Sequence, residues 1–188
     1  LPTQKEAKIH KEYAVVAVAN GRGLVNALKD MGADEVVTGG QTMNTSTEDF
    51  LKAFENIDAD NILVYPNNGN IYMAAKIAAE NYDKANVVVI PTKTIAEGYS
   101  AISMLDFDGV TIDDILEVEY EAIERVKTLE VTYAVRDAEI NGINIKKDEF
   151  ICLYNHDLIS ACKSRVEAVK NAFDSIPDFS EKEVLTLV

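Results

Sequence analysis

Cysteine and proline are scarce in this sequence, and long apolar runs are absent. Two cysteines and four prolines among 188 residues exclude a disulfide scaffold, a collagen-like repeat and a disordered chain. No apolar stretch is long enough for a signal peptide or a membrane span. Hydrophobic residues make up 47% of the chain, which at this length supports a buried core. We therefore expect a soluble, cytoplasmic globular protein with reduced cysteines.

Basic residues are also scarce, with 18 Lys and Arg against 32 Asp and Glu and a net charge of −14. The stretch from Asp106 to Glu149 holds 13 acids and 5 bases, so it contributes −8. Binding to nucleic acid needs a basic face that this chain cannot easily assemble. A solvated acidic surface is the favoured interpretation, and a partner with a basic surface is the alternative.

The residues that usually carry catalysis or bind metal form no known pattern. Cys152, His156 and Cys162 match no usual zinc spacing and have no fourth ligand, so core thiols are favoured. No Ser-His-Asp or Cys-His arrangement is credible, and a Walker-type phosphate loop is absent. We predict no catalytic residue and no metal site in this chain.

Four short apolar runs rich in β-branched residues predict buried parallel strands, at residues 14–19, 35–37, 61–65 and 86–90. Apolar residues recur at helical spacing between them. This alternation predicts an α/β protein with a doubly wound parallel sheet in the first half.

After residue 94 the pattern changes. Helices are expected over 95–105, 113–126 and 160–173, and Asn141-Gly142 between alternating runs predicts a two-residue β-hairpin. The second half therefore adds antiparallel strands and helices. We expect one domain over 1–188, with a parallel core at 1–105 and an antiparallel extension at 106–188.

The loops that follow the predicted parallel strands are rich in polar residues. Ligands bind at the carboxyl ends of such strands, so a partner or a small anion is expected there. Simple solvation of the loops and capping of the next helices are the alternatives. The candidate binding residues are Gly39, Gly40, Gln41, Thr42, Asn44, Asn67, Asn68, Asn70, Thr92, Lys93 and Thr94.

A dinucleotide site after the first strand is poorly supported. Gly21 and Gly23 match two glycines of the usual fingerprint, but Asn26 occupies the third position. No acidic residue ends the second predicted strand. A tight turn is the favoured interpretation.

Three long motifs in order, "VVTGGQTMNTSTEDFLKAF", "YPNNGNIYMAAKIAA" and "IPTKTIAEGYSAI", resemble the C-terminal region of the dihydroxyacetone-kinase-like fatty acid kinase A subunit. The likeness continues through "EVTYAVRDAEINGINIKKDEF" and covers most of the chain. The chain begins at Leu1 without methionine and ends in the strand-like "EVLTLV". We therefore expect a fragment of a larger kinase subunit.

The resemblance implies a fold like that of the acyl-binding B subunits, the DegV-like proteins. It places ATP and magnesium in a separate N-terminal kinase domain, so no cofactor is expected in this chain. It also implies a non-catalytic domain that docks the acyl-carrying B subunit near the kinase domain of its own protein. A binding or phosphatase-like domain for a phosphorylated or carboxylated small molecule, and a homodimerisation module, are the alternatives.

Overall fold

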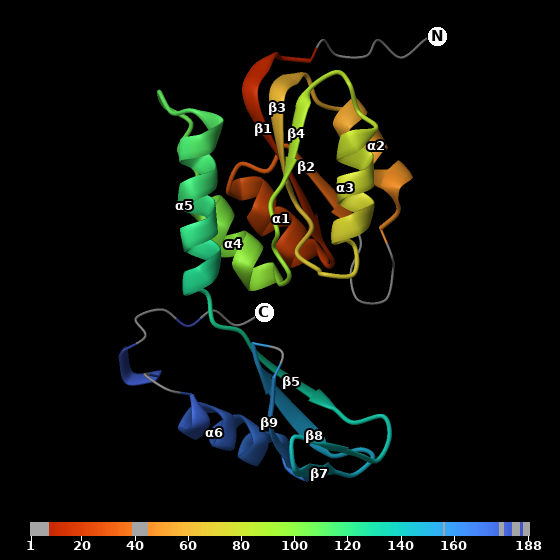
Figure 1. Cartoon of the computed structure of the whole chain (residues 1–188), viewed down its shortest axis with the longest axis vertical. Helices are drawn as coiled ribbons and strands as arrows, with labels where there is room; N and C mark the ends of the chain where they lie inside the picture. The colour runs from red at the N-terminus through yellow and green to blue at the C-terminus, as the bar shows by residue number, and fades with distance from the viewer. Residues whose placement is uncertain (1–7, 39–44, 156, 177–178, 182–184, 186–188) are drawn as a thin grey trace. The chain divides into compact units, whose positions relative to one another are not determined.

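The computed structural model describes residues 8–38, 45–155, 157–176, 179–181 and 185. These form an α/β chain with two compact units, residues 1–126 and 127–188 (Figure 1). The elements of the first unit are β1 Lys11–Ala19, α1 Arg22–Asp30, β2 Glu35–Thr38, α2 Thr47–Glu55, β3 Ala59–Tyr65, α3 Tyr72–Glu80, β4 Asn86–Val89, α4 Ile95–Ser103 and α5 Ile112–Arg125.

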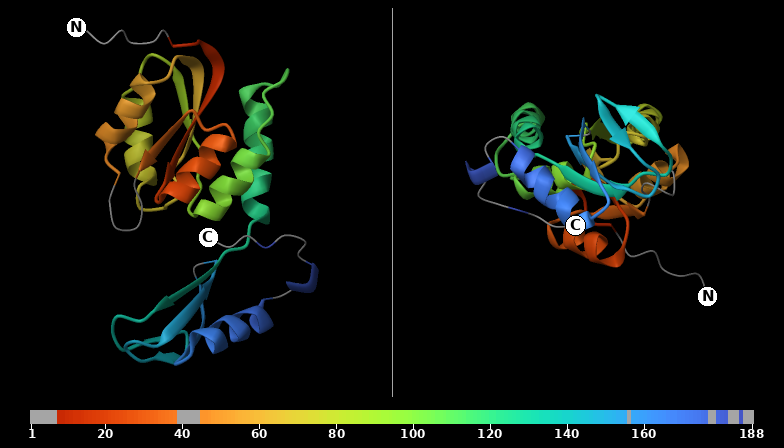
Figure 2. Two further views of the ribbon diagram at one scale, coloured as in Figure 1. Left: turned by 180° about the vertical axis from the view of Figure 1, so that it is seen from behind. Right: turned by 90° about the horizontal axis from the view of Figure 1, so that it is seen from below.

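The first unit is built on a parallel sheet in the order β2-β1-β3-β4. Residues of β1 alternate between two cores, with Val15 facing one and Val16 the other. Helices α1, α4 and α5 cover the face of Val15, and α2 and α3 cover the face of Val16 (Figure 2). The predicted doubly wound parallel sheet is confirmed.

Helix starts in this unit follow local sequence rules. Ser46 accepts the backbone N–H of Asp49 at 3.2 Å, and the Asp49 carboxylate accepts the Ser46 N–H at 3.0 Å, so α2 begins with a capping box. Thr111 and Asp114 form the same device at the start of α5. The cap predicted at Ser46 is thereby confirmed.

The second unit is antiparallel, with β5-β8-β9 as a three-stranded sheet and β6-β7 as a hairpin. Asn141 and Gly142 form the hairpin turn with φ of 53° and 78°, as their sequence predicts. The elements are β5 Leu129–Tyr133, β6 Ala138–Ile140, β7 Ile143–Ile145, β8 Phe150–Tyr154, β9 Asp157–Cys162, α6 Arg165–Ser175 and the 3₁₀ turn Phe179–Glu181.

Two sequence-based boundaries differ from the structure. The last helix begins at Arg165 rather than at residue 160, because residues 157–162 pair with β8 as a strand and Ser164 caps the helix. Helix α5 belongs to the first compact unit, because it packs against α4 and the Val15 face of the sheet. That the two units act as one domain with a DegV-like fold stays a prediction.

Cys152 and Cys162 are free thiols. Cys152 is buried beneath α6 and Cys162 is half-buried beside it. Burial raises the pKa of both thiols. Cys152 therefore has the core position that the sequence predicts, whereas His156 lies outside the described residues.

Candidate partner-binding edge of the parallel sheet

The carboxyl ends of the parallel strands form one edge of the first unit. In the order β2-β1-β3-β4, the direction of winding reverses between β1 and β3. The loops after these two strands therefore flank the position where open α/β sheets usually bind ligands.

Asn67, in the loop after β3, connects this edge across three strands. Its side-chain Nδ2 donates to the carbonyl oxygen of Val18 in β1 at 3.0 Å. Its backbone N–H donates to Oγ1 of Thr92, after β4, at 3.0 Å. The residue has φ of 57°, a left-handed conformation that asparagine tolerates better than most residues. Asn67 and Thr92, two of the predicted site residues, are thus brought together.

The amide of Asn67 also packs directly on α4 at Gly98. A Cβ atom at position 98 would lie 1.8 Å from Oδ1 of Asn67, so only glycine fits there without a shift. Oδ1 itself is buried and has no hydrogen-bond partner among the described residues. The space between the ends of β1 and β3 is therefore occupied by a side chain of the protein itself.

Thr92 and Thr94 have internal roles. Thr92 is completely buried. Thr94 caps α4 by accepting the N–H of Glu97 at 3.2 Å, and the Glu97 carboxylate accepts the N–H of Thr94 at 3.3 Å. The capping alternative considered for the "PTKT" loop is correct for Thr94.

Asn68, Asn70 and Lys93 are the described site residues nearest to solvent. Asn68 is half-buried, and its Oδ1 accepts the backbone N–H of Asn70 at 2.9 Å. Asn70 and Lys93 are exposed. The remaining predicted residues, Gly39, Gly40, Gln41, Thr42 and Asn44, lie outside the described part of the chain.

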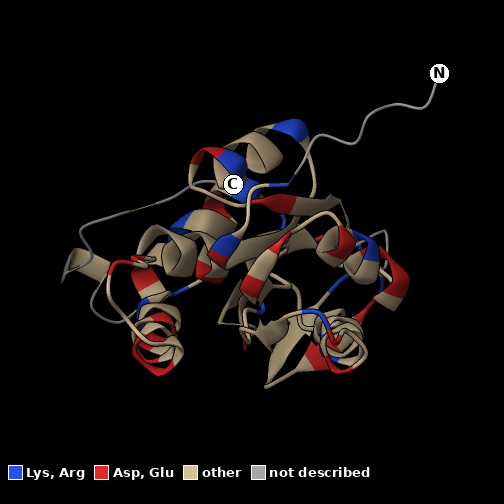
Figure 3. Ribbon diagram, turned by 90° about the horizontal axis from the view of Figure 1, so that it is seen from above, with Lys and Arg blue, Asp and Glu red and all other residues tan. Residues whose placement is uncertain are grey.

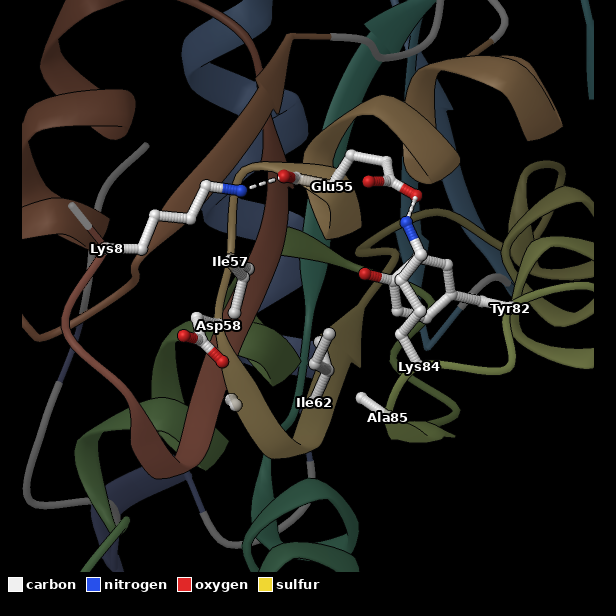
Figure 4. A pocket seen from close by; sticks show the side chains of 9 residues that line it. Lys8, Glu55, Ile57, Asp58, Ile62, Tyr82, Lys84 and Ala85 are labelled. Carbon is white, nitrogen blue, oxygen red and sulfur yellow. Dashed lines mark hydrogen bonds and ion pairs between the residues drawn. The ribbon is translucent and has the colours of Figure 1, made fainter. Parts of the chain in front are cut away.

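A hollow of about 280 Å³ lies at the opposite, amino end of the sheet (Figure 4). Sequence reasoning did not identify it, because its residues come from four separate segments. Ile57, Ile62 and Ala85 are among its apolar lining residues, and Lys8, Glu55, Asp58, Tyr82 and Lys84 supply its polar groups.

The charged groups at this hollow already have partners within the chain. Lys84 Nζ lies 2.6 Å from Oε1 of Glu55 and 6.0 Å from the ring centroid of Tyr82. Hydrogen bonding to Glu55 raises the pKa of Lys84. Lys8 donates to the backbone carbonyl of Glu55, and His10 lies 2.9 Å from Asp58. The hollow therefore lacks the unsatisfied polar group that marks a ligand site.

Two further features bear on the kind of site that the chain can form. Within the described residues, no group of three or more His, Cys, Asp or Glu side chains is placed to hold a metal ion. In the same part of the chain, no helix combines the length and apolar character needed to cross a membrane.

The fold and the loop edge define a doubly wound α/β unit joined to a small antiparallel unit. Residues 14–188 match the FakA-like C-terminal family, which is described by the C-terminal region of the fatty acid kinase A subunit. The chain belongs to this family, as the three sequence motifs indicated.

Relatives of the chain come from staphylococci. An uncharacterized protein of Staphylococcus epidermidis is 38% identical over 186 residues, which are 98% of this chain and 33% of that protein. An uncharacterized protein of Staphylococcus aureus strain USA300 is 37% identical over 177 residues, which are 94% of this chain and 32% of that protein. The chain therefore spans about a third of the length of the curated relatives it matches.

Proposed function

We propose that this chain is the non-catalytic C-terminal domain of a fatty acid kinase subunit. In this proposal it docks an acyl-binding, DegV-like B subunit so that the bound fatty acid reaches a kinase domain elsewhere in the longer protein. ATP and magnesium bind in that kinase domain. The observation that carries the proposal is family membership over residues 14–188.

The proposed contact surface is the outer side of the loops at the carboxyl edge of the sheet. Asn70 and Lys93 supply exposed polar groups there, beside the expected contribution of Gln41, Thr42 and Asn44. Asn67 and Thr92 hold the loops that carry these groups, because they fasten the ends of β3 and β4 together. Rigid loops support docking because little conformational entropy is lost on binding.

The test is calorimetry of this chain with an acyl-loaded B subunit. Two double variants address the surface, Thr42→Ala with Asn44→Ala, and Asn70→Ala with Lys93→Ala. We expect each to weaken association about tenfold or more, since truncated contact residues at interfaces commonly cost more than 1 kcal/mol. Lys84→Ala, at the amino end of the same sheet, is the control and should leave the affinity within about twofold.

Two results would contradict the proposal at different levels. If the parent chain does not bind the B subunit, the docking role is wrong. If the parent binds and both double variants bind equally well, docking occurs elsewhere on the chain. Saturable binding of phosphate or acetate at the loops, without B-subunit binding, would instead support the alternative of a small-molecule domain.

A further inference from the structure

A second cavity, of about 120 Å³, lies within the first unit, between the end of α4 and the first half of α5. Its walls are mostly apolar, and each charged residue that the structure places in its lining is acidic. The lining residues are Met104, Leu105, Asp106, Val110, Asp114, Ile115, Val118 and Glu119.

Glu119 is the unusual member of this lining. It is completely buried, and neither carboxylate oxygen has a hydrogen-bond partner in the described part of the chain. The nearest polar group of the core is the Tyr65 hydroxyl, which interacts with Glu119 but forms no hydrogen bond of normal geometry. Burial raises the pKa of Glu119 to about 7, and the interaction with Tyr65 opposes part of this rise.

An unpaired buried carboxylate is costly, and a cation that reaches it removes much of that cost. The outer part of the cavity suits an apolar stem, because Met104 and Val118 line it and are 53% and 43% exposed. Asp106 and Asp114 add negative charge to the same lining. An occupant with an aliphatic stem and a positive head matches both features.

A basic protein side chain has this combination, because lysine and arginine carry a charge at the end of an apolar stem. The charge of the chain favours the same class of partner. Its net charge is −14, and α5 alone carries six acids against one base. Figure 3 shows the excess of acidic over basic positions. Such a surface attracts a basic partner and repels a second copy of itself.

We propose that the cavity between α4 and α5 receives a lysine or arginine side chain of a partner protein, whose charged head pairs with Glu119. This contact is separate from the loops at the carboxyl edge of the sheet. It goes beyond the docking role assigned to those loops and does not depend on it. Val118 and Met104 contact the stem, and Asp106 and Asp114 attract the charge.

The pairing depends on pH, because only ionised Glu119 attracts the cation. The titratable groups around Glu119 are Tyr65 from β3, Asp106 after α4 and Asp114 on α5 itself. Burial and the charge of Glu119 raise the pKa of Tyr65 well above its ordinary value, so its hydroxyl stays neutral near pH 7. A hydrogen bond from Thr111 lowers the pKa of Asp114. Binding should therefore strengthen as Glu119 ionises between pH 6 and pH 8.

The experiment is an NMR titration of the ¹⁵N-labelled chain at pH 6 and pH 8 with two probes, n-butylammonium and N-acetyl-lysine methylamide. We expect saturable shifts of amides in residues 104–119 with both probes, and binding several-fold tighter at pH 8. Glu119→Gln should weaken binding about tenfold, as the loss of a close charge pair implies. Glu117→Gln, an exposed acid on α5 that does not line the cavity, should change it less than twofold.

The outcomes separate a protein side chain from other occupants. n-Butanol, which has the same stem without the charge, should not saturate the site. If n-butylammonium binds and the lysine amide does not, the cavity takes free amines and the proposal is wrong. Equal binding of both probes to Glu119→Gln, or no shift with either probe, also overturns it.

Discussion

The carboxyl edge of the sheet and the cavity between α4 and α5 treat buried polar groups differently. At the edge, the Asn67 amide and backbone bond to β1 and to the loop after β4, and one neutral oxygen is left against Gly98. At the cavity, an ionisable carboxyl is left with both oxygens unpaired. The edge is therefore an internally completed structure, and the cavity is an incomplete one that a cation can complete.

Gly98→Ala should have the largest effect on this contrast. The new Cβ would meet the Asn67 amide, which is held by Val18 and by its place between the strands. Overpacking of this kind costs about 2–3 kcal/mol, measurable by chemical denaturation. The matched control is Gly23→Ala in α1, where no atom lies within 4 Å and alanine should stabilise by about 0.5 kcal/mol or more.

The double variant Asn67→Gly with Gly98→Ala tests the cause of that loss. Removing the amide gives the new methyl group space, while glycine keeps the left-handed conformation at position 67. The two changes should therefore cost less together than the sum of their separate effects. Additive costs would show that contact with Asn67 is not what requires glycine at position 98.

Glu119→Gln should remove a pH dependence of stability. The folded-state pKa of about 7 lies above that of an exposed glutamate, about 4.3. The favourable contribution of the neutral acid is fully present below the unfolded-state value and is lost as pH rises through 7. From pH 5 to pH 8.5 the parent should lose about 2 kcal/mol relative to Glu119→Gln.

Denaturant midpoints at several pH values measure this difference. Glu117→Gln is the control, because the exposed side chain has no such burial. It should retain the pH dependence of the parent. If Glu119→Gln and the parent have parallel stability profiles, the Glu119 carboxyl is solvated and the contrast with the edge disappears.

Substitutions of exposed groups at the edge should have a small effect on stability. Asn70→Ala with Lys93→Ala removes two side chains in contact with solvent, and such changes usually stay within about 0.5 kcal/mol. Denaturation of the double variant beside the parent measures this. A loss above about 2 kcal/mol would mean that these side chains support the fold rather than a contact surface.

ATP with magnesium should have no effect on the melting temperature of this chain. A ligand that binds only the folded state raises stability, so a thermal shift assay measures such binding directly. The nucleotide site is proposed for the kinase domain of the longer protein. A shift of several degrees would place a nucleotide site within residues 1–188.

The sequence predicted the parallel sheet well, because its strands are continuous β-branched runs separated by helical spacing. It also predicted the Asn141-Gly142 turn and the caps at Ser46 and Thr94, since these depend on neighbouring residues. The strand at 157–162 was missed because its pairing with β8 is a tertiary interaction that a local pattern does not contain.

The contacts of the site were harder to predict. The bonds from Asn67 to Val18 and Thr92 join residues 49 and 25 positions apart, so no local spacing indicates them. Glu119 did leave a signal, because it stands four residues after Ile115 and three before Ala122, on the buried face of α5. An acid on an apolar helical face is a pattern that sequence reasoning can use.

The bond between Asn67 and Val18 has a consequence for how a partner is recognised. In related sheet architectures, the gap between the two central strands admits part of a small molecule. Here a side chain of the protein fills that gap, and Gly98 closes it from the helix side. Recognition at this edge therefore takes place on the outside of the loops, between two surfaces, rather than by enclosing a guest molecule within the fold.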